Sequence, residues 1–360
     1  MAMTLQNDIN NMRGAINMAR RGIGRTAENP SVGCVIVKNG AVIARARTAD
    51  GGRPHAESQA LNAAGDQAKG ATLYVTLEPC ANHGQTPPCV DAVIASGVSR
   101  VVIGVSDPDP RTCGASIQKM KNAGIEVVTN ILQKECEELH RGFISRVTHA
   151  RPFVTLKCAC TLDGKIACAN GESQWITGES ARRHVHSVRA RHDAILVGVD
   201  TALTDDPMLN TRVDGLSHII TRIVMDRNLR LKPDSKLVQS VKQFPLLVLH
   251  ESGDPEPLTK QGVHVVKLDC SDIVVVLKAI AEQGVNILLI EGGAKIHTSF
   301  LNSGLFDELM IYRAPTLLGD TAKSVVSDLN IDTLAQRSDL NRVTLRPLGN
   351  DMLEIYKNKD

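Results

Sequence analysis

The sequence is poor in aromatic residues, in net charge and in long apolar segments. Aromatic residues make up only 2% of its 360 residues, so a stacking platform for unpaired bases is not expected. The 41 Lys and Arg residues nearly balance the 39 Asp and Glu residues, and the net charge of +2 lacks the basic excess typical of nucleic-acid binders. No apolar run approaches the roughly 20 residues that span a bilayer. We therefore expect neither a nucleic-acid partner nor a membrane partner.

The N-terminal segment and the cysteines favour a cytoplasmic location. Residues 1–14 are polar and lack the apolar core of a signal peptide. The nine cysteines are odd in number and scattered, as in compartments where thiols stay reduced, buried or bound to metal. We expect a cytoplasmic protein that acts on a small molecule, and a homo-oligomer is possible.

The length of the chain suits two domains, each with its own core. In the first half, short apolar runs alternate with helical patterns, which predicts an α/β/α sandwich around one sheet. The expected strands are 32–37, 42–46, 72–77, 100–105 and 125–128, and the expected helices are 12–21, 55–64, 88–96, 116–123 and 133–146. A boundary near 148–152 gives a first domain of residues 1–148 and a second of residues 149–360.

The second half shows a similar alternation and predicts another α/β domain. Its expected strands are 153–158, 194–199, 222–226, 246–249, 263–267, 286–290 and a late strand near 308–313; its expected helices are 179–190, 273–283 and 298–302. A Gly-Gly pair at 292–293 follows one strand and precedes a helix. Such a pair lets backbone N–H groups approach a phosphate, although alone it is more often a tight turn.

Four residues of the first domain form a pattern typical of a catalytic zinc site. His55 opens a predicted helix, and Cys80 and Cys89 border the loop after a predicted strand. One imidazole and two thiolates suit Zn²⁺ and leave its fourth position to water. Glu57 is close enough to the histidine to carry protons without binding the metal. The pattern predicts zinc-dependent hydrolytic deamination of an amino-substituted ring, with Glu57 as the catalytic residue.

Other interpretations of these residues stay open. The second cysteine follows the first by nine residues, whereas the usual zinc-deaminase motif has three. A purely structural zinc site would need a fourth ligand, for which His83 is the candidate. An enzyme that edits nucleic-acid bases belongs to another class, and the near-neutral charge argues against it.

The longer cysteine spacing resembles that of the bifunctional deaminase and reductase family of riboflavin biosynthesis. The motifs that carry the resemblance are Thr76-Leu77-Glu78-Pro79-Cys80, Thr86-Pro87-Pro88-Cys89, Pro54-His55-Ala56-Glu57 and Asp107-Pro108, with 28–37 upstream and 151–157, 162–167, 171–178, 193–198, 205–212 and 307–309 in the second half. The resemblance runs from about Asn10 to the C-terminus. It implies a cytidine-deaminase-like α/β/α sandwich followed by a dihydrofolate-reductase-like α/β domain.

The resemblance also implies two reactions on one substrate. The first is zinc-dependent hydrolytic deamination of 2,5-diamino-6-ribosylamino-4(3H)-pyrimidinone 5′-phosphate, and the second is NADPH-dependent reduction of its ribosyl group to a ribityl chain. The implied cofactor-binding residues are Ala159, Trp175, Thr201, Asp205, Gly293, Ala294, Lys295, Ile296, His297, Thr298 and Ser299. The implied substrate-binding residues are Asn29, Asp107, Ser173, Arg189, Leu209, Arg212 and Glu291.

The physical roles of several of these residues can be stated. Arg189 and Arg212 offer planar forks for a phosphate, and Lys157 or Asp205 could handle the proton that accompanies sugar opening. Alternatives are a solvated helix face for Arg189 and core packing for Trp175, the only tryptophan. We interpret His184 and His186 as surface residues.

Four positions depart from the residues common in the family: Thr48, Asn82, Gln85 and Asp109. The resemblance implies that these positions face the ring or the phosphate of the substrate. Asn82 and Gln85 bring no cationic group to a substrate phosphate, so weaker phosphate contacts in the deaminase are expected. The alternative function is therefore a reductase with a catalytically weakened N-terminal zinc domain.

Overall fold

The computed structural model describes residues 2–82, 87–110, 112–213, 215 and 218–358. The chain divides between Ala150 and Arg151 into two compact units, each with its own sheet. Among the described residues, no helix is long and apolar enough to cross a membrane.

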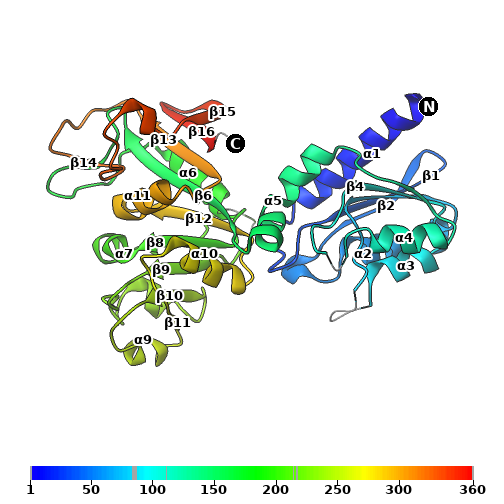
Figure 1. Ribbon diagram of the computed structural model, residues 1–360, viewed down its shortest axis with the longest axis horizontal. Coiled ribbons are helices and arrows are strands. Elements are labelled where there is room, and N and C mark those ends of the chain that lie inside the picture. The colour runs from blue at the N-terminus through cyan, green and yellow to red at the C-terminus, as the bar shows by residue number, and fades with distance from the viewer. Residues whose placement is uncertain (1, 83–86, 111, 214, 216–217, 359–360) are drawn as a thin grey trace. The chain divides into compact units, whose positions relative to one another are not determined.

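The first unit is a five-stranded sheet with helices on both faces (Figure 1). Its strand order is β2-β1-β3-β4-β5. Strand β1 is antiparallel to both of its neighbours, β2 and β3, whereas β3, β4 and β5 are parallel to one another. The strands are β1 (Gly33–Lys38), β2 (Ala41–Arg47), β3 (Thr72–Leu77), β4 (Arg100–Val105) and β5 (Glu126–Val128). The helices are α1 (Ala2–Arg20), α2 (Ala56–Ala64), α3 (Cys89–Ala95), α4 (Ala115–Asn122) and α5 (Gln133–His149), with 3₁₀ turns at Asp50–Gly52 and Gly65–Ala68.

Glycines shape two places in this unit. Asn39 and Gly40 both have positive φ, as a two-residue turn between β1 and β2 requires, because this backbone twist matches that of the strands. Helix α1 lies directly on the backbone of β1. A Cβ atom at Gly33 would stand 1.9 Å from the carbonyl oxygen of Ala15, so only glycine allows this close approach.

The second unit is built on a nine-stranded sheet of order β11-β10-β9-β8-β12-β6-β13-β16-β15. The strands from β11 to β13 are parallel, and β16 and β15 add an antiparallel hairpin at one edge. The strands are β6 (Phe153–Thr161), β8 (Ala194–Gly198), β9 (Thr221–Met225), β10 (Leu246–His250), β11 (His264–Lys267), β12 (Ile287–Gly292), β13 (Glu308–Ala314), β15 (Leu340–Leu348) and β16 (Asp351–Asn358). Strands β7 (Lys165–Ala167) and β14 (Lys323–Ser324) form a separate ribbon.

Helices cover both faces of this sheet, so its central strands are buried on both sides. The helices are α6 (Glu179–Arg189), α7 (Val199–Asp205), α8 (Lys236–Gln239), α9 (Glu256–Thr259), α10 (Ile273–Glu282) and α11 (Ala294–Ser303), with a 3₁₀ turn at Leu334–Gln336. Successive residues of β12 point to opposite faces: Leu288 and Ile290 pack in the core beneath α10 and α11, whereas Leu289 packs in the core beneath α6 to α9.

Most elements expected from the sequence are present, and several of their limits differ. The strands expected at 72–77 and 100–105 have these bounds in the structure. Helix α1 begins ten residues before the expected Met12, and α11 begins at Ala294 instead of Thr298. Helix α7 and the hairpin of β15 and β16 were not expected at all.

Candidate functional sites

Three potential metal ligands meet where α2 and α3 begin. His55 immediately precedes α2, Cys89 is the first residue of α3, and Cys80 lies in the loop after β3. One donor atom from each lies within 4.8 Å of the other two. The Nδ1 atom of His55 is the imidazole atom that faces the thiols, 3.3 Å from Sγ of Cys89 and 3.8 Å from Sγ of Cys80. This donor set suits zinc and leaves a fourth position open.

The protein already stabilises a thiolate in this cluster. A hydrogen bond from the Cys89 thiol lowers the pKa of Cys80 to about 4, and the Cys89 backbone N–H also donates to Sγ of Cys80 at 3.2 Å. The same pairing raises the pKa of Cys89 well above its usual value. Two neighbouring thiolates repel each other, so only one of the two thiols ionises readily. A cation bound by both sulfurs removes this repulsion and deprotonates both thiols.

Glu57 lies in the first turn of α2, beside the three donor atoms. Its side chain is buried, and its Oε2 atom has no hydrogen-bond partner among the described residues. Burial raises the pKa of Glu57 to about 7, although the His55 imidazole opposes this rise. A buried carboxylate oxygen without a partner is unusual in a folded protein and indicates a group that completes its bonding only when the site is filled.

A second buried carboxylate shapes the loop after β4. Glu78 accepts hydrogen bonds from the backbone N–H groups of Asp107 and Gly114 and from the hydroxyl of Ser116. Asp107 is itself buried, its carboxylate accepts the N–H of Asp109, and burial raises its pKa to about 6. The motif that supplies Cys80 therefore also fixes, through Glu78, the loop that carries Asp107. This link could not be predicted from the sequence, because the partners lie 29 to 38 residues from Glu78 along the chain.

The positions that depart from the family have different environments. The Thr48 hydroxyl accepts the N–H of Val32 and donates to the carbonyl of Pro30, and Thr48 is only 1% exposed. The expectation that Thr48 faces the substrate is therefore wrong, since its polar group is used within the fold. Asn82 is exposed and donates to the Thr112 hydroxyl. The expectations for His83 and Gln85 concern residues outside the described part of the chain.

Asn29 lies near the chain segment that leads to His55. It accepts the Thr26 hydroxyl on its backbone carbonyl, and its side chain lies close to Gly52. A Cβ atom at Gly52 would stand 2.4 Å from Nδ2 of Asn29, and φ of Gly52 is +90°. Glycine at position 52 thus makes room for the Asn29 amide.

The second unit has a cavity of about 1140 Å³ at the carboxyl ends of its parallel strands. Ligands of parallel α/β sheets bind at this edge. The cavity is lined by Lys157 to Ala159 of β6, Glu291 of β12, residues of α7, the start of α11 and the ribbon of β7 and β14. One wall of the cavity is therefore formed by this two-stranded ribbon, which is separate from the nine-stranded sheet.

Most residues expected to bind a cofactor line this cavity. They are Ala159, Thr201, Asp205, Gly293, Ala294, Lys295, Ile296 and His297, and Ser173 and Glu291 from the expected substrate side join them. Ser299 lines a smaller cavity of about 560 Å³ that also includes Lys295 and Ile296. The Thr298 hydroxyl instead donates to the carbonyl of Ala294 and accepts the N–H of Ser327, which ties α11 to the segment after β14.

The first turn of α11 is suited to an anionic ligand. Gly293 precedes the helix in extended conformation, and φ of Gly292 is +140°, a conformation that favours glycine. A Cβ atom at Gly293 would lie 3.1 Å from the Thr201 hydroxyl, so a side chain there would crowd α7. The backbone N–H groups of a helix start, facing a cavity, form a phosphate site.

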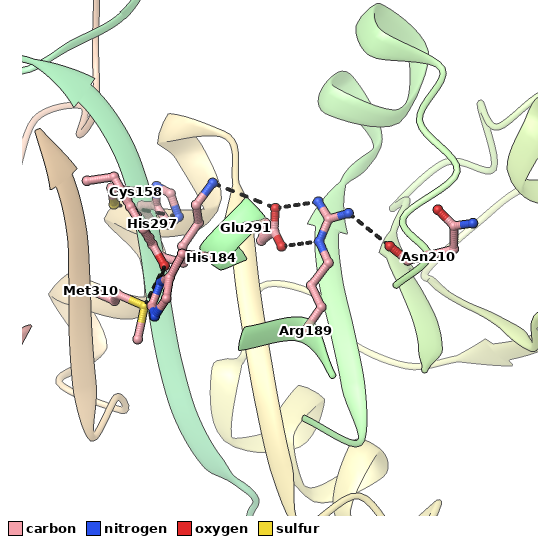
Figure 2. A network of polar contacts seen from close by, with 9 residues as sticks. Cys158, His184, Arg189, Asn210, Glu291, His297 and Met310 are labelled. Carbon is pink, nitrogen blue, oxygen red and sulfur yellow. Dashed lines mark hydrogen bonds and ion pairs between the residues drawn. The ribbon is translucent and has the colours of Figure 1, made fainter. Parts of the chain in front are cut away.

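Three charged residues form an ion-pair cluster beside this cavity (Figure 2). Arg189 holds the Glu291 carboxylate with two hydrogen bonds of 2.6 and 2.8 Å, and Lys157 Nζ lies 3.8 Å from the same carboxylate. Although burial alone would raise the pKa of Glu291, Arg189 and Lys157 lower it to about 2. Arg189 also donates to the carbonyl of Asn210 at 3.1 Å. The alternative of a solvated helix face is wrong, because the Arg189 side chain is only 14% exposed. Its fork is engaged by Glu291 and Asn210 in this geometry, and the expected contact of Arg189 with the substrate stays a prediction.

The remaining expected residues lie around this cluster. Trp175 is 69% exposed and its ring faces the Arg182 guanidinium at 4.6 Å, so the core-packing alternative is wrong. Leu209 is buried, and its φ is +50°. The carbonyl groups of the residues on either side of it accept hydrogen bonds from Arg222 and Arg189. Arg212 is exposed.

The interpretation of His184 and His186 as surface residues is wrong. Both are half-buried: His184 bonds the Tyr312 hydroxyl at 2.7 Å, and the buried Nδ1 of His186 has no partner among the described residues. Sequence reasoning also missed Tyr312, which is fully buried with Lys157 Nζ 5.7 Å from its ring centroid. The two-residue spacing of the histidines shows only that they do not share a helix face. It does not show whether a residue of a distant strand, such as Tyr312, contacts one of them.

Comparisons with known proteins agree with the two units. The model of the RibD C-terminal domain matches residues 152–353, and that of the cytidine and deoxycytidylate deaminase zinc-binding region matches residues 5–105. The chain is 39% identical to riboflavin biosynthesis protein RibD of Aquifex aeolicus, over 97% of this chain and 98% of that protein, and 38% identical to RibD of Escherichia coli, over 95% and 96%.

Solved structures give the same result. RibD of Acinetobacter baumannii superposes with a TM-score of 0.93 at 37% identity, covering 99% of this chain and all of that one. A Thermotoga maritima structure, titled a diaminohydroxyphosphoribosylaminopyrimidine deaminase and 5-amino-6-(5-phosphoribosylamino)uracil reductase, superposes with a TM-score of 0.88 at 34% identity over the same shares. The expected fold class is confirmed: a cytidine-deaminase-like sandwich followed by a dihydrofolate-reductase-like α/β domain.

Proposed function

The chain belongs to the RibD family and is a bifunctional deaminase and reductase of riboflavin biosynthesis, and from this premise we propose which of its residues carry each reaction. The substrate we propose is 2,5-diamino-6-ribosylamino-4(3H)-pyrimidinone 5′-phosphate. Residues 1–148 deaminate its ring, and residues 149–360 reduce its ribosyl group with NADPH. A cytoplasmic location and a homo-oligomer stay predictions.

The deamination site consists of His55, Cys80 and Cys89 as zinc ligands and Glu57 as the proton carrier. When bound, zinc activates a water for attack on the ring carbon that bears the amine. Glu57 is placed to hold a proton and to donate it to the departing amine, so that, once water has added to the ring carbon, ammonia leaves and a ring carbonyl remains. The observation that carries this proposal is the Oε2 atom of Glu57, which is buried beside three donor atoms within 4.8 Å of one another and has no hydrogen-bond partner in the described part of the chain.

Asn29 and Asp107 are our candidates for holding the pyrimidine. An amide and a carboxyl can pair with the amino and carbonyl groups on a pyrimidine edge. The Glu78 carboxylate, through its bond to the Asp107 backbone, keeps this loop in place. The role of Asp107 thus depends on a residue of the cysteine motif itself.

The proposed reductase site lies in the large cavity of the second unit, which many of its residues line. NADPH, when bound, supplies the hydride that reduces C1 of the sugar. Its phosphates would be held at the start of α11 by Gly293 to Ser299, and its remaining contacts come from Ala159, Trp175, Thr201 and Asp205. The glycines and the position of the helix start in the lining of the cavity support the phosphate assignment.

The sugar phosphate lies, in this proposal, on the side of Ser173, Leu209, Arg212 and Glu291. Lys157 gives a proton to the ring oxygen as the sugar opens, and C1 then accepts the hydride, which leaves a ribityl chain and NADP⁺. Arg189 acts through Glu291, because its fork is engaged there. The exposed Arg212 is left to bind the phosphate.

The test is to measure the two activities separately in one Glu57→Gln variant. We expect ammonia release to fall at least about 100-fold, while NADPH oxidation with pre-deaminated substrate stays within about twofold of wild type. Zinc content should not change, because Glu57 is not a ligand in this proposal.

A matched control is Glu126→Gln, which alters an exposed carboxylate of the same unit and should keep both activities. Ammonia release that persists in Glu57→Gln would remove the role given to Glu57. A wild type that oxidises NADPH but releases no ammonia would instead support a reductase with a weakened zinc domain.

A further inference from the structure

Two of the groups near the Lys157 ammonium, the Glu291 carboxylate and the Tyr312 side chain, are each contacted by helix α6. The ammonium lies between the Glu291 carboxylate, 3.8 Å from Nζ, and the ring of Tyr312, whose centroid is 5.7 Å from Nζ. Helix α6 reaches the first neighbour through Arg189 and the second through His184. Figure 2 shows Glu291 facing Arg189, and His184 on the other side of the cluster.

The contact of His184 with Tyr312 has a definite direction. Nε2 of His184 lies 2.8 Å from Nη2 of Arg346, and a guanidinium can only donate, so Nε2 is the accepting nitrogen. Nδ1 therefore carries the hydrogen and donates it to the Tyr312 oxygen, 2.7 Å away. The Tyr312 hydroxyl is then free to donate to Sδ of Met310 at 3.3 Å.

The surroundings keep His184 in this neutral form. Burial and the positive charges of Arg346 and Arg191 lower its pKa below the usual value. Tyr312 is fully buried, so its hydroxyl depends on protein groups for its hydrogen bonds, and the described ones are those with His184 and Met310. A lysine side chain is flexible and strongly hydrated when nothing holds it.

We propose that His184 and Tyr312 are positioning residues of the reductase reaction, which fix the aromatic face against which the Lys157 ammonium rests. Glu291 attracts the ammonium from one side, and the ring, anchored by His184, limits it on the other. The inference rests on the proposed role of Lys157 as proton donor. It predicts that breaking the link lowers kcat, while binding of NADPH and of the sugar phosphate is unchanged.

The experiment is a double-mutant cycle on the link. His184→Leu and Tyr312→Phe each remove one partner of the same hydrogen bond, and each should lower the reductase kcat about fivefold with both KM values within about twofold. The double variant should also be about fivefold slower, because the two changes remove one interaction. If kcat of the double variant falls about 25-fold, the product of the two single losses, the proposal is overturned. It is also overturned if the single variants lose no activity.

Two further variants separate positioning from general damage. His184→Asn keeps a donor near the place of Nδ1 and should restore most of kcat. Arg183→Ala changes a neighbour on α6 whose side chain is 73% exposed, and should match wild type. A His184→Asn variant as slow as His184→Leu contradicts the proposal.

The assay uses pre-deaminated sugar phosphate and the full-length protein, so that failures can be told apart. If wild type does not reduce this compound, the proposed function itself is wrong. If wild type reduces it and Lys157→Met is equally fast, the role of Lys157 is wrong and the positioning proposal fails with it. If Lys157→Met is slow and the cycle shows no effect, only the positioning proposal is wrong.

Discussion

Glu291 shows how a single carboxylate organises charge beside the cavity. Its side chain is 7% exposed and contacts both Arg189 and Lys157. A buried carboxylate that loses its bidentate partner keeps the cost of desolvation without the compensating attraction. The pair therefore matters for both the stability and the activity of the second unit.

Replacement of Arg189 by Met should expose this dependence. We expect the free energy of unfolding to fall by about 3 kcal/mol and the reductase activity to fall at least about tenfold. Calorimetry and NADPH oxidation measure the two effects. Arg183→Met, on the exposed side of the same helix, should change neither by much; a similar loss there would mean that α6 itself is sensitive to substitution.

At the scale of single residues, spacing along the chain predicts the members of a short metal-binding motif and few other functional residues. His55, Glu57, Cys80 and Cys89 could be named because metal ligands impose a recognisable order along the chain. The partners of Lys157 could not, because Tyr312 and Glu291 come from strands more than 130 residues later. Thr48 was misjudged because nothing local shows that its hydroxyl bonds the backbone of Pro30 and Val32.

Helix α1 illustrates how closely an element can approach a sheet. Gly33→Ala should destabilise the first unit by at least about 3 kcal/mol, because the added Cβ would stand 1.9 Å from the Ala15 carbonyl oxygen. Gly14→Ala, in α1 itself, would meet only Val35 at 3.7 Å and should stabilise the helix by about 0.5 to 1 kcal/mol. Thermal unfolding of both variants checks the pair; equal effects would contradict the close contact.

Helix α5 is joined to β3 by a buried histidine. Nε2 of His140 lies 3.1 Å from the Thr76 hydroxyl, and burial lowers the pKa of His140 to about 3. Between this value and the ordinary value of 6.5, the unfolded chain binds the proton and the folded chain does not. Stability therefore rises with pH across this window and is lost as the pH falls below 6.5.

From pH 7 to pH 5 this group should cost the wild type about 2 kcal/mol. His140→Gln cannot titrate, so its unfolding temperature should fall less over the same pH change. The exposed His149, also on α5, offers the control His149→Gln, which should follow wild type. Equal acid sensitivity of wild type and His140→Gln would exclude His140 as the cause.

Elements with strong patterns were predictable, and those that depend on their neighbours were not. The buried parallel strands are continuous apolar runs, which is why β3 and β4 could be bounded. Strand β15 is mostly exposed and contains Pro347, which argues against a strand, so only its pairing with β16 reveals it. The short helix α7 begins directly after β8, at Val199, with no polar loop between them to mark its start, so it was not predicted.

In the proposed function the two units carry separate reactions, which makes metal removal informative. Dialysis against a zinc chelator should abolish ammonia release, while NADPH oxidation with pre-deaminated substrate should stay within about twofold, since no described zinc candidate lies in the second unit. Restored zinc should restore ammonia release. Loss of both activities on chelation would show that the reductase depends on the metal site.

The place of β16 in the second sheet has a consequence for biosynthesis. Strand β16 lies between β13 and β15 and pairs with both, and its Glu354 binds Arg313 of β13. The ribosome must therefore release Asn358 before this sheet can close, whereas the strands of the first unit end at Val128. During translation the first unit can therefore fold before the sheet of the second unit is complete. Nascent chains thus pass through a stage in which β13 has an open edge, and this is when they most need protection from association with one another.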